Sequence, residues 1–388
     1  MRTVVLGLTA ALLLSLPAAP AAATTPDHRP SAAADRAAYP SLAVKRVVRG
    51  LDHPWDVRVL DRGVLIYTQR DRARLSIWDH GHKRAVRFPS DSVWVSGETG
   101  LTGLALDPEF AQNRRLYTCQ GGFRSGGRHD VRVMAWRLNA KATRVTRIRQ
   151  LVGGFPTTTG RHAGCRLLID SEGSLFVGTG DAVIGTSPQN LRSFGGKTLR
   201  LDRFTGRPWP TNPYVDARAR AKRYVFTYGH RNVQGLAQRS DGTLWSIEQG
   251  TDCDDEVNRL LKGGNYGWDP APGYGEYTPM TDRSLPGRQI GAVWSSGDPT
   301  LATSGGGFVH GPALGAYDGT LAVAALKAAR VLFLTLSADG DLRRVHVPRE
   351  LRRYGRIRTV VDGPGSTFYV TTDNGNGADS VLRVRPRR

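Results

Sequence analysis

Ser240-Asp241-Gly242-Thr243-Leu244-Trp245 joins a polar turn to the start of a short apolar strand, and five other segments follow a related pattern. Helical periodicity is almost absent, whereas short alternating apolar runs bounded by Gly, Asp and Pro recur along the chain. The residues that we take as equivalent in the six copies are Leu65, Leu116, Leu175, Leu244, Leu321 and Phe368. Successive copies lie 47 to 77 residues apart. Each span can hold about four short strands with their loops, which is the content of one propeller blade.

We therefore predict an all-β fold, a single six-bladed β-propeller over residues 41–388. Residues 41–48 are expected to add an outer strand to the C-terminal blade, whose final strand is predicted at residues 380–384. Ring closure of this kind protects sheet edges that would otherwise be exposed. A pair of β-sandwiches is the alternative, but it explains the recurrence of six similar strands less well.

The N-terminal residues have the features of an export signal. Arg2 supplies a positive charge, residues 4–16 form an apolar run and small residues precede position 24, so residues 1–23 are predicted to be a signal peptide. Residues 24–40, rich in Ala, Pro and Ser, are expected to be a disordered lead-in. No later stretch reaches about 18 uncharged apolar residues, so we predict a secreted protein without a transmembrane segment.

The charge balance is strongly basic, with 54 Lys and Arg against 34 Asp and Glu and a formal net charge of +20. Such a balance raises nucleic acid as a partner. The charges are spread over the chain, however, and the densest clusters, at residues 218–223 and 349–358, lack the repeated aromatic side chains of a base-stacking surface. We therefore expect no nucleic-acid partner and interpret the charge as a basic surface that attracts anionic ligands or an anionic envelope.

Three cysteines, Cys119, Cys165 and Cys253, are an odd number for a protein of an oxidising compartment. One bridge and one remaining thiol is the expected arrangement. Cys119 and Cys165 lie on predicted strands of neighbouring units, which favours a bridge between them. Their spacing does not match that of a zinc site, so we predict none.

His162 and Asp181 are candidates for acid–base chemistry. His162 lies just before a predicted strand, and Asp181 ends the same unit, so both can reach the axis of a propeller at one face. An imidazole beside a carboxylate is the usual construction of a general base, because the carboxylate fixes the tautomer and stabilises the protonated form. Taken alone, each residue is more often a hydrogen-bonded turn residue, and that alternative stays open.

Arg231, Asn232 and Gln234 form a second candidate group, between Gly229 and Gly235. Long polar side chains at this spacing do not alternate with apolar residues as they would on a solvated strand face. Arginine offers a planar fork that suits carboxylates or quinone oxygens. We therefore interpret the group as functional rather than structural.

A hard cation is a further candidate ligand. Gly250 permits unusual backbone angles, so its carbonyl oxygen and that of Thr251 could turn toward a cation such as calcium. Glu256, which follows two aspartates, could help to bind a second cation or could neutralise the basic surroundings. Both interpretations of these carboxylates stay open.

Lys327 ends the apolar run of the fifth unit, and Arg356 and Arg358 alternate on one face of a predicted strand. Three cations at successive blade entries could hold a ligand with several carboxylates. Each residue alone is equally consistent with an ordinary position on the surface.

Together these residues resemble the soluble quinoprotein glucose and aldose sugar dehydrogenases, six-bladed propellers that use pyrroloquinoline quinone (PQQ) and calcium. The resemblance extends from about residue 51 to residue 384 and is specific as a set of motifs. The matching segments are Tyr-Gly-His-Arg-Asn-Val-Gln-Gly-Leu at 228–236, Glu-Gln-Gly at 248–250, Asp-Asp-Glu at 254–256, Gly-Gly-Asn-Tyr-Gly-Trp at 263–268, Leu-Ala-Leu-Asp-Pro-Glu-Phe at 104–110 and Gly-Arg-Ile-Arg at 355–358.

The resemblance implies that His162 is the catalytic base and that Asp181 holds it in place. Arg231 would polarise the quinone carbonyl that accepts hydride, and Asn232 and Gln234 would line the cofactor pocket. The implied reaction oxidises the anomeric hydroxyl of an aldose to a lactone. The reduced cofactor would then pass its electrons to an acceptor that the sequence does not identify.

The same resemblance implies a set of ligands for the cofactor and the metal. Lys327, Arg356 and Arg358 would pair with the carboxylates of PQQ. The carbonyl oxygens of Gly250 and Thr251 would hold calcium, which also binds the quinone and acts as a Lewis acid.

Three positions depart from the family pattern. Glu98 stands where the family usually has Gln, and a carboxylate there could disfavour the anionic cofactor or alter the choice of substrate. Thr251 replaces the usual Pro, a change that is tolerated if only the carbonyl oxygen binds. Trp294 is the single aromatic residue in a region that carries cofactor-stacking aromatic residues in some members.

Two other functions remain possible on the same fold. A calcium-dependent lactonase or other hydrolase would need carboxylates converging on the metal, whereas this sequence offers mainly backbone carbonyls and basic groups. A non-catalytic carbohydrate- or ligand-binding propeller would keep the fold without the chemistry. Glu98 favours that interpretation, while His162, Asp181 and Arg231 favour the sugar dehydrogenase.

Overall fold

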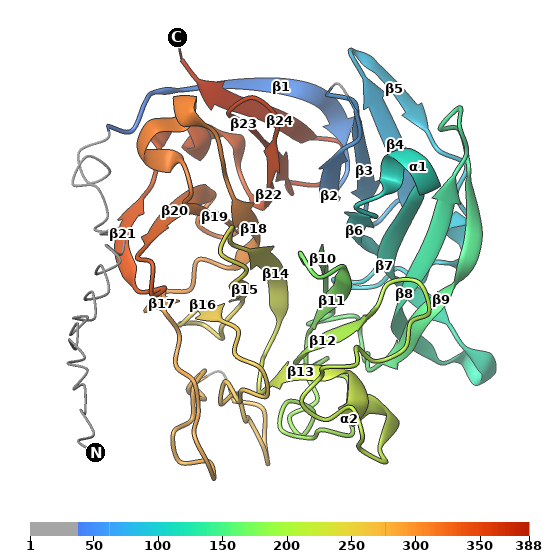
Figure 1. Cartoon of the computed structure of the whole chain (residues 1–388), viewed down its shortest axis with the longest axis vertical. Helices are drawn as coiled ribbons and strands as arrows, with labels where there is room; N and C mark the ends of the chain where they lie inside the picture. The colour runs from blue at the N-terminus through green and yellow to red at the C-terminus, as the bar shows by residue number, and fades with distance from the viewer. Residues whose placement is uncertain (1–37, 62, 276, 388) are drawn as a thin grey trace, which may run out of the picture. The chain divides into compact units, whose positions relative to one another are not determined.

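Six antiparallel sheets of four strands each surround a common axis in the computed structural model of the protein (Figure 1). The structure describes residues 38–61, 63–275 and 277–387. The first strands of consecutive sheets pack side by side, and that of the sixth sheet contacts that of the first, so the sheets close into a ring. The predicted six-bladed β-propeller is thus confirmed. The predicted signal peptide and most of the predicted lead-in lie outside the described residues.

Each blade runs from an inner strand at the axis to an outer strand at the edge. Blade 1 contains β2 (Pro54–Val59), β3 (Leu65–Gln69), β4 (Arg74–Asp79) and β5 (His82–Ala85); blade 2 contains β6 (Leu101–Leu106), β7 (Arg115–Phe123), β8 (His129–Leu138) and β9 (Val145–Phe155). Blade 3 contains β10 (Gly164–Ile169), β11 (Ser174–Thr179), β12 (Lys197–Asp202) and β13 (Val225–Tyr228); blade 4 contains β14 (Val233–Gln238), β15 (Leu244–Glu248), β16 (Glu256–Arg259) and β17 (Trp294–Ser295). Blade 5 contains β18 (Thr303–Phe308), β19 (Leu321–Ala325), β20 (Arg330–Leu336) and β21 (Leu342–His346); blade 6 contains β22 (Ile357–Gly363), β23 (Thr367–Thr372), β24 (Asp379–Pro386) and β1 (Leu42–Leu51).

Helices are short in the described part of the chain and lie between strands. They are the α-helices α1 (Phe110–Asn113) and α2 (Arg220–Tyr224) and the 3-10 helices η2 (Ser90–Ser92), η3 (Ser125–Gly127), η4 (Pro312–Tyr317) and η5 (Arg349–Tyr354).

The two ends of the described chain complete blade 6. Strand β1 pairs with β24 in antiparallel register from Leu42 opposite Pro386 to Leu51 opposite Asp379. An N-terminal strand therefore closes the C-terminal blade, as the sequence predicts, although it extends three residues beyond the predicted residue 48. This pairing gives β24 a partner on both sides.

The recurring apolar residue occupies an equivalent position in every blade. The six residues lie on the second strands β3, β7, β11, β15, β19 and β23. Leu65 pairs with Val59 and Leu175 pairs with Ile169, in each case the last residue of the inner strand. The turn that precedes each copy is therefore the connection between the first two strands of a blade.

The core is divided into apolar clusters, each of which lies between two neighbouring blades. One cluster joins blades 2 and 3 through residues such as Tyr117 and Val177, and another joins blades 5 and 6 through Phe333 and Phe368. These side chains are almost fully buried, and apolar burial is the dominant favourable contribution to folding. The blades are thus held together by side-chain packing rather than by shared strands.

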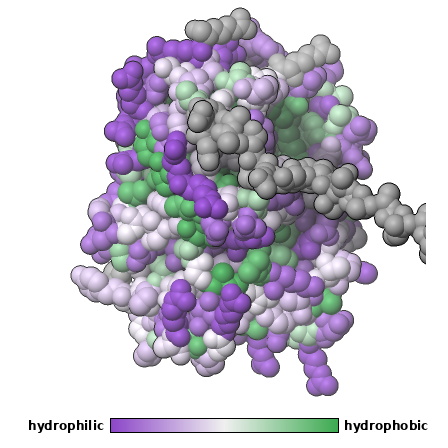
Figure 2. All heavy atoms as spheres, turned by 60° about the vertical axis from the view of Figure 1, so that its left-hand side comes forward, coloured by the Kyte–Doolittle hydropathy of each residue, from purple (hydrophilic) through white to green (hydrophobic). Residues whose placement is uncertain are grey.

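Hydrophilic side chains project across the face shown in Figure 2, with hydrophobic residues between them. This distribution fits the net charge of +20. Among the residues that the structure describes, no helix is long and apolar enough to cross a membrane.

A disulfide joins blades 2 and 3. It links Cys119 on β7 with Cys165 at the start of β10, the pair that the sequence favours, whereas Cys253 is a free cysteine. The bridge lies inside the apolar cluster between these blades, where both cysteines are buried.

Replacing Cys119 and Cys165 together by alanine is expected to lower the free energy of unfolding by up to about 4 kcal/mol. The physical reason is that the bridge spans 46 residues, so its removal frees a long loop in the unfolded chain. Urea unfolding followed by tryptophan fluorescence measures the change. Cys253→Ala is the control, and equal urea midpoints for the double variant and this control would contradict the expectation.

Candidate active site

A pocket of about 330 Å³ lies at the ends of the inner strands where blades 2 to 5 begin. Its lining residues are Glu98, Arg161, His162, Arg231, Gln249, Gly250, Thr251, Asp252, Thr300 and Ala302. Five residues that the sequence singles out as site candidates, far apart in the chain, are therefore brought to one cavity. They are Glu98, His162, Arg231, Gly250 and Thr251.

His162 and Asp181 form a buried hydrogen-bonded pair. The Nδ1 atom of His162 lies 2.9 Å from Oδ1 of Asp181. Because an ionised carboxylate can only accept, the neutral form of the imidazole carries its proton at Nδ1 and keeps its lone pair at Nε2. Nε2 makes no hydrogen bond to the part of the chain that the structure describes. A neutral imidazole in this tautomer can take a proton from a group in the pocket.

The backbone around this pair adopts unusual conformations. His162, Ala182 and Val183 have φ values of +48°, +59° and +59°, in a backbone region that residues other than glycine rarely adopt. The segments also approach closely, since a Cβ atom on Gly180 would lie 1.8 Å from the carbonyl oxygen of His162. Such strain persists only where the surrounding structure enforces it, and it is typical of functional sites.

Four donors converge on the Asp181 carboxylate. Oδ1 accepts hydrogen bonds from His162 and from the N–H of Val183, at 2.9 and 2.8 Å. Oδ2 accepts from the indole N–H of Trp268 at 2.8 Å and from the hydroxyl of Tyr274 at 2.6 Å. Neither aromatic residue is among the site residues predicted from the sequence. Trp268 ends a recognised motif, which was a usable signal, whereas Tyr274 lies in a long irregular loop that gives none.

Arg231 lies beside the His162–Asp181 pair, immediately before β14. Its carbonyl oxygen accepts the N–H of Asp181 at 2.8 Å. The guanidinium donates to the carbonyl of Gln249 at 3.2 Å, and its central carbon lies 5.7 Å from the centre of the Trp268 ring. Arg231 is therefore a buried cation held at the wall of the pocket.

Glu98 is bound to the two amide side chains that the resemblance places in the cofactor pocket. Its Oε2 accepts from Nδ2 of Asn232 and from Nε2 of Gln234, each at 3.1 Å. Asn232 and Gln234 are buried, whereas Glu98 is half-buried and lines the pocket. The departure from the family pattern thus lies in direct contact with predicted site residues.

Arg358 extends this polar network toward blades 6 and 1. Its Nη1 donates to Oε1 of Gln234 at 2.9 Å, and its Nη2 forms an ion pair with Asp373, which also binds His53. Burial opposes ionisation of Asp373, but Arg358 and His53 overcome it and hold the pKa of this carboxyl well below its usual range. In this structure Arg358 therefore has a protein carboxylate as its partner.

Gly250 and Thr251 present their backbone at the pocket. Their carbonyl oxygens accept no hydrogen bond from the residues that the structure describes. The expected reason for Gly250 is wrong, because its φ is not in the left-handed region. Glycine is needed there because a Cβ atom would lie 2.1 Å from the carbonyl oxygen of Cys253.

Glu256 lies outside the pocket lining, in a buried carboxylate pair with Glu248. The two residues are opposite each other on β16 and β15. Burial and the Glu248 carboxylate raise the pKa of Glu256 to about 8. Asn258 bridges the pair with hydrogen bonds of 2.9 Å to Glu248 and 3.2 Å to Glu256.

Three other candidates are not in the pocket lining. Lys327 and Arg356 are exposed. Trp294 packs against the apolar cluster between blades 4 and 5. The structure thus does not bring these three side chains to the His162–Asp181 pair.

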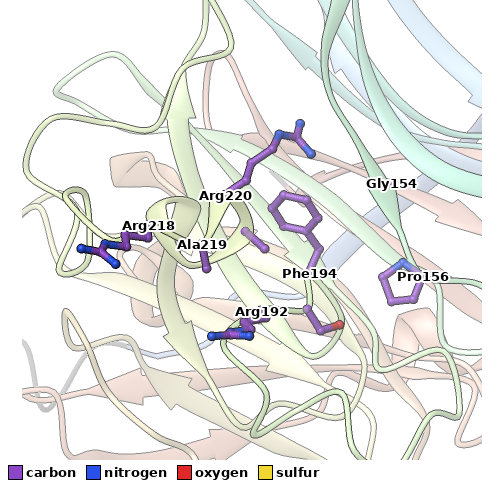
Figure 3. A pocket seen from close by; sticks show the side chains of 9 residues that line it. Gly154, Pro156, Arg192, Phe194, Arg218, Ala219 and Arg220 are labelled. Atoms are coloured by element: carbon purple, nitrogen blue, oxygen red, sulfur yellow. The ribbon is translucent and has the colours of Figure 1, made fainter.

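A second cavity of about 690 Å³ lies beside α2 on blade 3 (Figure 3). Arg192, Arg218 and Arg220 line it together with Phe194, and the Arg220 guanidinium lies 5.4 Å from the centre of the Phe194 ring. Its lining holds no histidine or carboxylate, so it offers no general base. The pocket lined by His162 and Arg231 is therefore the candidate active site.

Comparisons with known proteins agree with this geometry. The chain matches the family model for glucose/sorbosone dehydrogenase over residues 51–383. It is 30% identical over 348 residues to the aldose sugar dehydrogenase YliI of Escherichia coli (strain K12), which covers 87% of this chain and 91% of that protein.

Two solved structures are similar over most of the chain. The PQQ-bound aldose sugar dehydrogenase of Streptomyces coelicolor has 27% identity and a TM-score of 0.74, covering 90% of this chain and 100% of that one. The apo form of the soluble aldose sugar dehydrogenase of Escherichia coli has 28% identity and a TM-score of 0.80, covering 89% and 100%. The chain therefore belongs to the glucose/sorbosone dehydrogenase family.

Proposed function

We propose that the protein is a secreted, PQQ-dependent dehydrogenase that oxidises the anomeric hydroxyl of an aldose to a lactone, with calcium as a Lewis acid. The observation that carries this proposal is the His162–Asp181 pair beside Arg231 at one pocket. Family membership supports sugar oxidation, and similarity to the PQQ-bound Streptomyces coelicolor enzyme supports the cofactor. The Cys119–Cys165 bridge supports an oxidising compartment.

The donors of the pocket fit an anionic quinone. Arg161 and Arg231 line it, and guanidinium groups suit carboxylates and quinone oxygens. In the adjoining network, the buried Nε of Arg358 has no hydrogen-bond partner among the described residues, so a donor remains available. PQQ, when bound, supplies the oxidant that accepts two electrons from the sugar.

His162 would accept the proton of the anomeric hydroxyl at Nε2, because Nδ1 already carries a proton. Asp181 would stabilise the imidazolium that results, as a carboxylate does for a general base. Trp268 and Tyr274 keep Oδ2 of Asp181 hydrogen-bonded, which leaves Oδ1 directed at the imidazole. The residues of this chain thus bind the proton and fix its acceptor.

The carbonyl oxygens of Gly250 and Thr251 are the proposed ligands of calcium. They are hard oxygen donors at the pocket without hydrogen bonds from the described residues. Glu256 does not line the pocket, so its role as a ligand would require a second, separate cation. Glu256 and its buried neighbour Glu248 repel each other when both are ionised, and a bound cation would relieve this repulsion.

Reconstitution tests the proposed function. Purified apo-protein mixed with PQQ and calcium is expected to reduce a dye in the presence of at least one aldose, and a chelator should abolish the reaction. Restoring calcium should restore it. Turnover without PQQ would contradict the proposed oxidant. Binding of PQQ without turnover on any aldose would favour the non-catalytic ligand-binding propeller.

Glu98→Gln is expected to tighten PQQ binding by about tenfold. The substitution removes one negative charge next to an anionic cofactor while keeping an oxygen that can accept from Asn232 and Gln234. A single partly exposed charge interaction is worth about 1–2 kcal/mol, and 1.4 kcal/mol corresponds to a factor of about ten. Titration of apo-protein with PQQ, followed by absorbance, measures it. The exposed Glu172→Gln, on the β10–β11 turn, is the control; equal affinities would show that Glu98 does not oppose the cofactor.

A further inference from the structure

Lys197 is a fully buried lysine without an ion-pair partner in the described structure. Burial lowers the pKa of its amine to about 7, although the Asp181 carboxylate favours the charged form. Lys197 opens β12, and its Nζ donates to the carbonyl oxygens of Ser187, Pro188 and Gly195 at 2.7, 2.9 and 2.5 Å. Lysine is almost never fully buried unless it is paired, because desolvating a charge is costly. A neutral amine has only two N–H donors, so only the ammonium form satisfies all three carbonyls.

All three carbonyls belong to residues 182–196, which make up most of the connection between β11 and β12 (residues 180–196). The segment contains turns but neither a strand nor a helix. Connections of this length without secondary structure are uncommon in compact domains and are often functional. The Lys197 side chain holds distant parts of the segment together, because one Nζ atom donates to carbonyl oxygens at positions 187, 188 and 195.

The segment held in this way supports Asp181 and Trp268. The N–H of Gly196 donates to the carbonyl of Gly180 at 2.9 Å, directly before Asp181. The side chain of Gln189 donates to the carbonyl of Trp268 at 3.0 Å, and the indole of Trp268 binds Asp181. Displacement of the segment would therefore move the carboxylate and one of its donors.

The same segment supports the backbone that carries Arg231. The N–H of Gly229 donates to the carbonyl of Pro188 at 3.1 Å, and that of His230 donates to the carbonyl of Gly196 at 3.2 Å. Pro188 is itself one of the acceptors of Lys197. Lys197 is thus connected through this segment to both parts of the site, the His162–Asp181 pair and Arg231.

We propose that Lys197 is a positioning residue for the proposed sugar oxidation, which fixes residues 182–196 and through them Asp181, Trp268 and Arg231. Lys197 does not line the pocket, so it acts only through these residues. The inference rests on the proposed function, but its geometry can be tested without cofactor.

Lys197→Met removes the ammonium while keeping an unbranched side chain of similar length. We expect kcat to fall by about 10- to 100-fold, since misplacing catalytic groups by about 1 Å has effects of this size. The KM for the aldose and the affinity for PQQ should change by less than about threefold, well below the effect on kcat. Lys197→Gln, which keeps two N–H donors, should restore part of the lost kcat.

Arg200→Met is the matched control. Arg200 lies on the same strand, is buried and pairs with Asp170 and Glu172, at the end of β12 away from the pocket. Both substitutions are expected to lower the thermal midpoint, but only Lys197→Met should lower kcat strongly. Equal losses of kcat in the two variants would reduce Lys197 to a structural residue and overturn the proposal.

Two readouts stay valid if the enzyme proves inactive with PQQ. In ¹⁵N-histidine-labelled apo-protein, the Nδ1–H resonance of His162, identified by its loss in His162→Ala, should shift in Lys197→Met and stay in place in Arg200→Met. An unshifted resonance in a folded Lys197 variant would overturn the proposal.

If neither Lys197 variant folds, hydrogen exchange on the wild-type protein tests whether residues 182–196 are held in place. Amides of residues 182–196 should exchange at least about tenfold more slowly than those of the loop at residues 211–219, because slow exchange reports a segment that seldom opens. Similar rates in the two segments would contradict the role of Lys197.

Discussion

His162→Ala is expected to lower kcat by about 10²- to 10⁴-fold while leaving PQQ binding nearly unchanged. A general base contributes a factor of this size, and Nε2 of His162 is the acceptor that the pocket offers for the hydroxyl proton. The cofactor contacts that we propose come from other residues, so the absorbance of bound PQQ should titrate as in the wild type. Stopped-flow reduction of bound PQQ by an aldose measures the chemical step directly.

The matched control is His310→Ala. His310 also pairs with an aspartate, with Nδ1 at 3.1 Å from Oδ2 of Asp362, but the pair is exposed and follows β18 at the end of that strand away from the pocket. Its loss should leave kcat unchanged. Near-normal turnover in His162→Ala would rule out the proposed base, whereas a fall in both variants would point to a general loss of structure.

Asp181→Asn is expected to have the second largest effect, a fall in kcat of about 10²- to 10⁴-fold. Both oxygens of Asp181 face donors, so either orientation of the amide turns its NH₂ group toward other N–H or O–H groups. If the NH₂ group faces His162, the imidazole must present a lone pair at Nδ1 and carry its proton at Nε2. In that tautomer it can no longer act as the base.

The same substitution should also cost about 1–3 kcal/mol of folding stability, because a buried donor is left without an acceptor. Stopped-flow kinetics and urea unfolding measure the two effects separately. Asp362→Asn, in the exposed pair with His310, is the control and should change neither quantity appreciably. A variant with wild-type stability and turnover would show that Asp181 is not required in its ionised form.

The fold could be predicted because the propeller repeats one local pattern six times. Each copy places a turn before an apolar residue on the second strand of a blade, and this arrangement depends on neighbouring residues alone. Leu65 and Leu321, for example, are both fully buried at equivalent positions. The pairing of β1 with β24 followed from the need to protect a sheet edge rather than from any local motif.

The site could be predicted only in part, because long-range contacts decide which polar groups meet. Glycine-flanked polar residues at the strand ends, such as His162 and Arg231, do reach one pocket. Lys327 and Arg356 were predicted from similar positions at strand ends, but both are exposed, because sequence position does not determine the direction of a side chain. Neither Tyr274 nor Lys197 could be predicted as a site residue. Tyr274 lies in an irregular loop without a motif, and Lys197 is fully buried, although lysine side chains are usually exposed.

The pairing of Leu42–Leu51 with Asp379–Pro386 also sets the order in which the molecule can be made. A ribosome delivers the partner of β1 only after all five preceding blades have been synthesised. Until then β1 has no strand to pair with, and blade 6 lacks its two outer strands. A nascent chain stalled before residue 379 should therefore remain sensitive to protease near residues 42–51, however well its middle blades have folded.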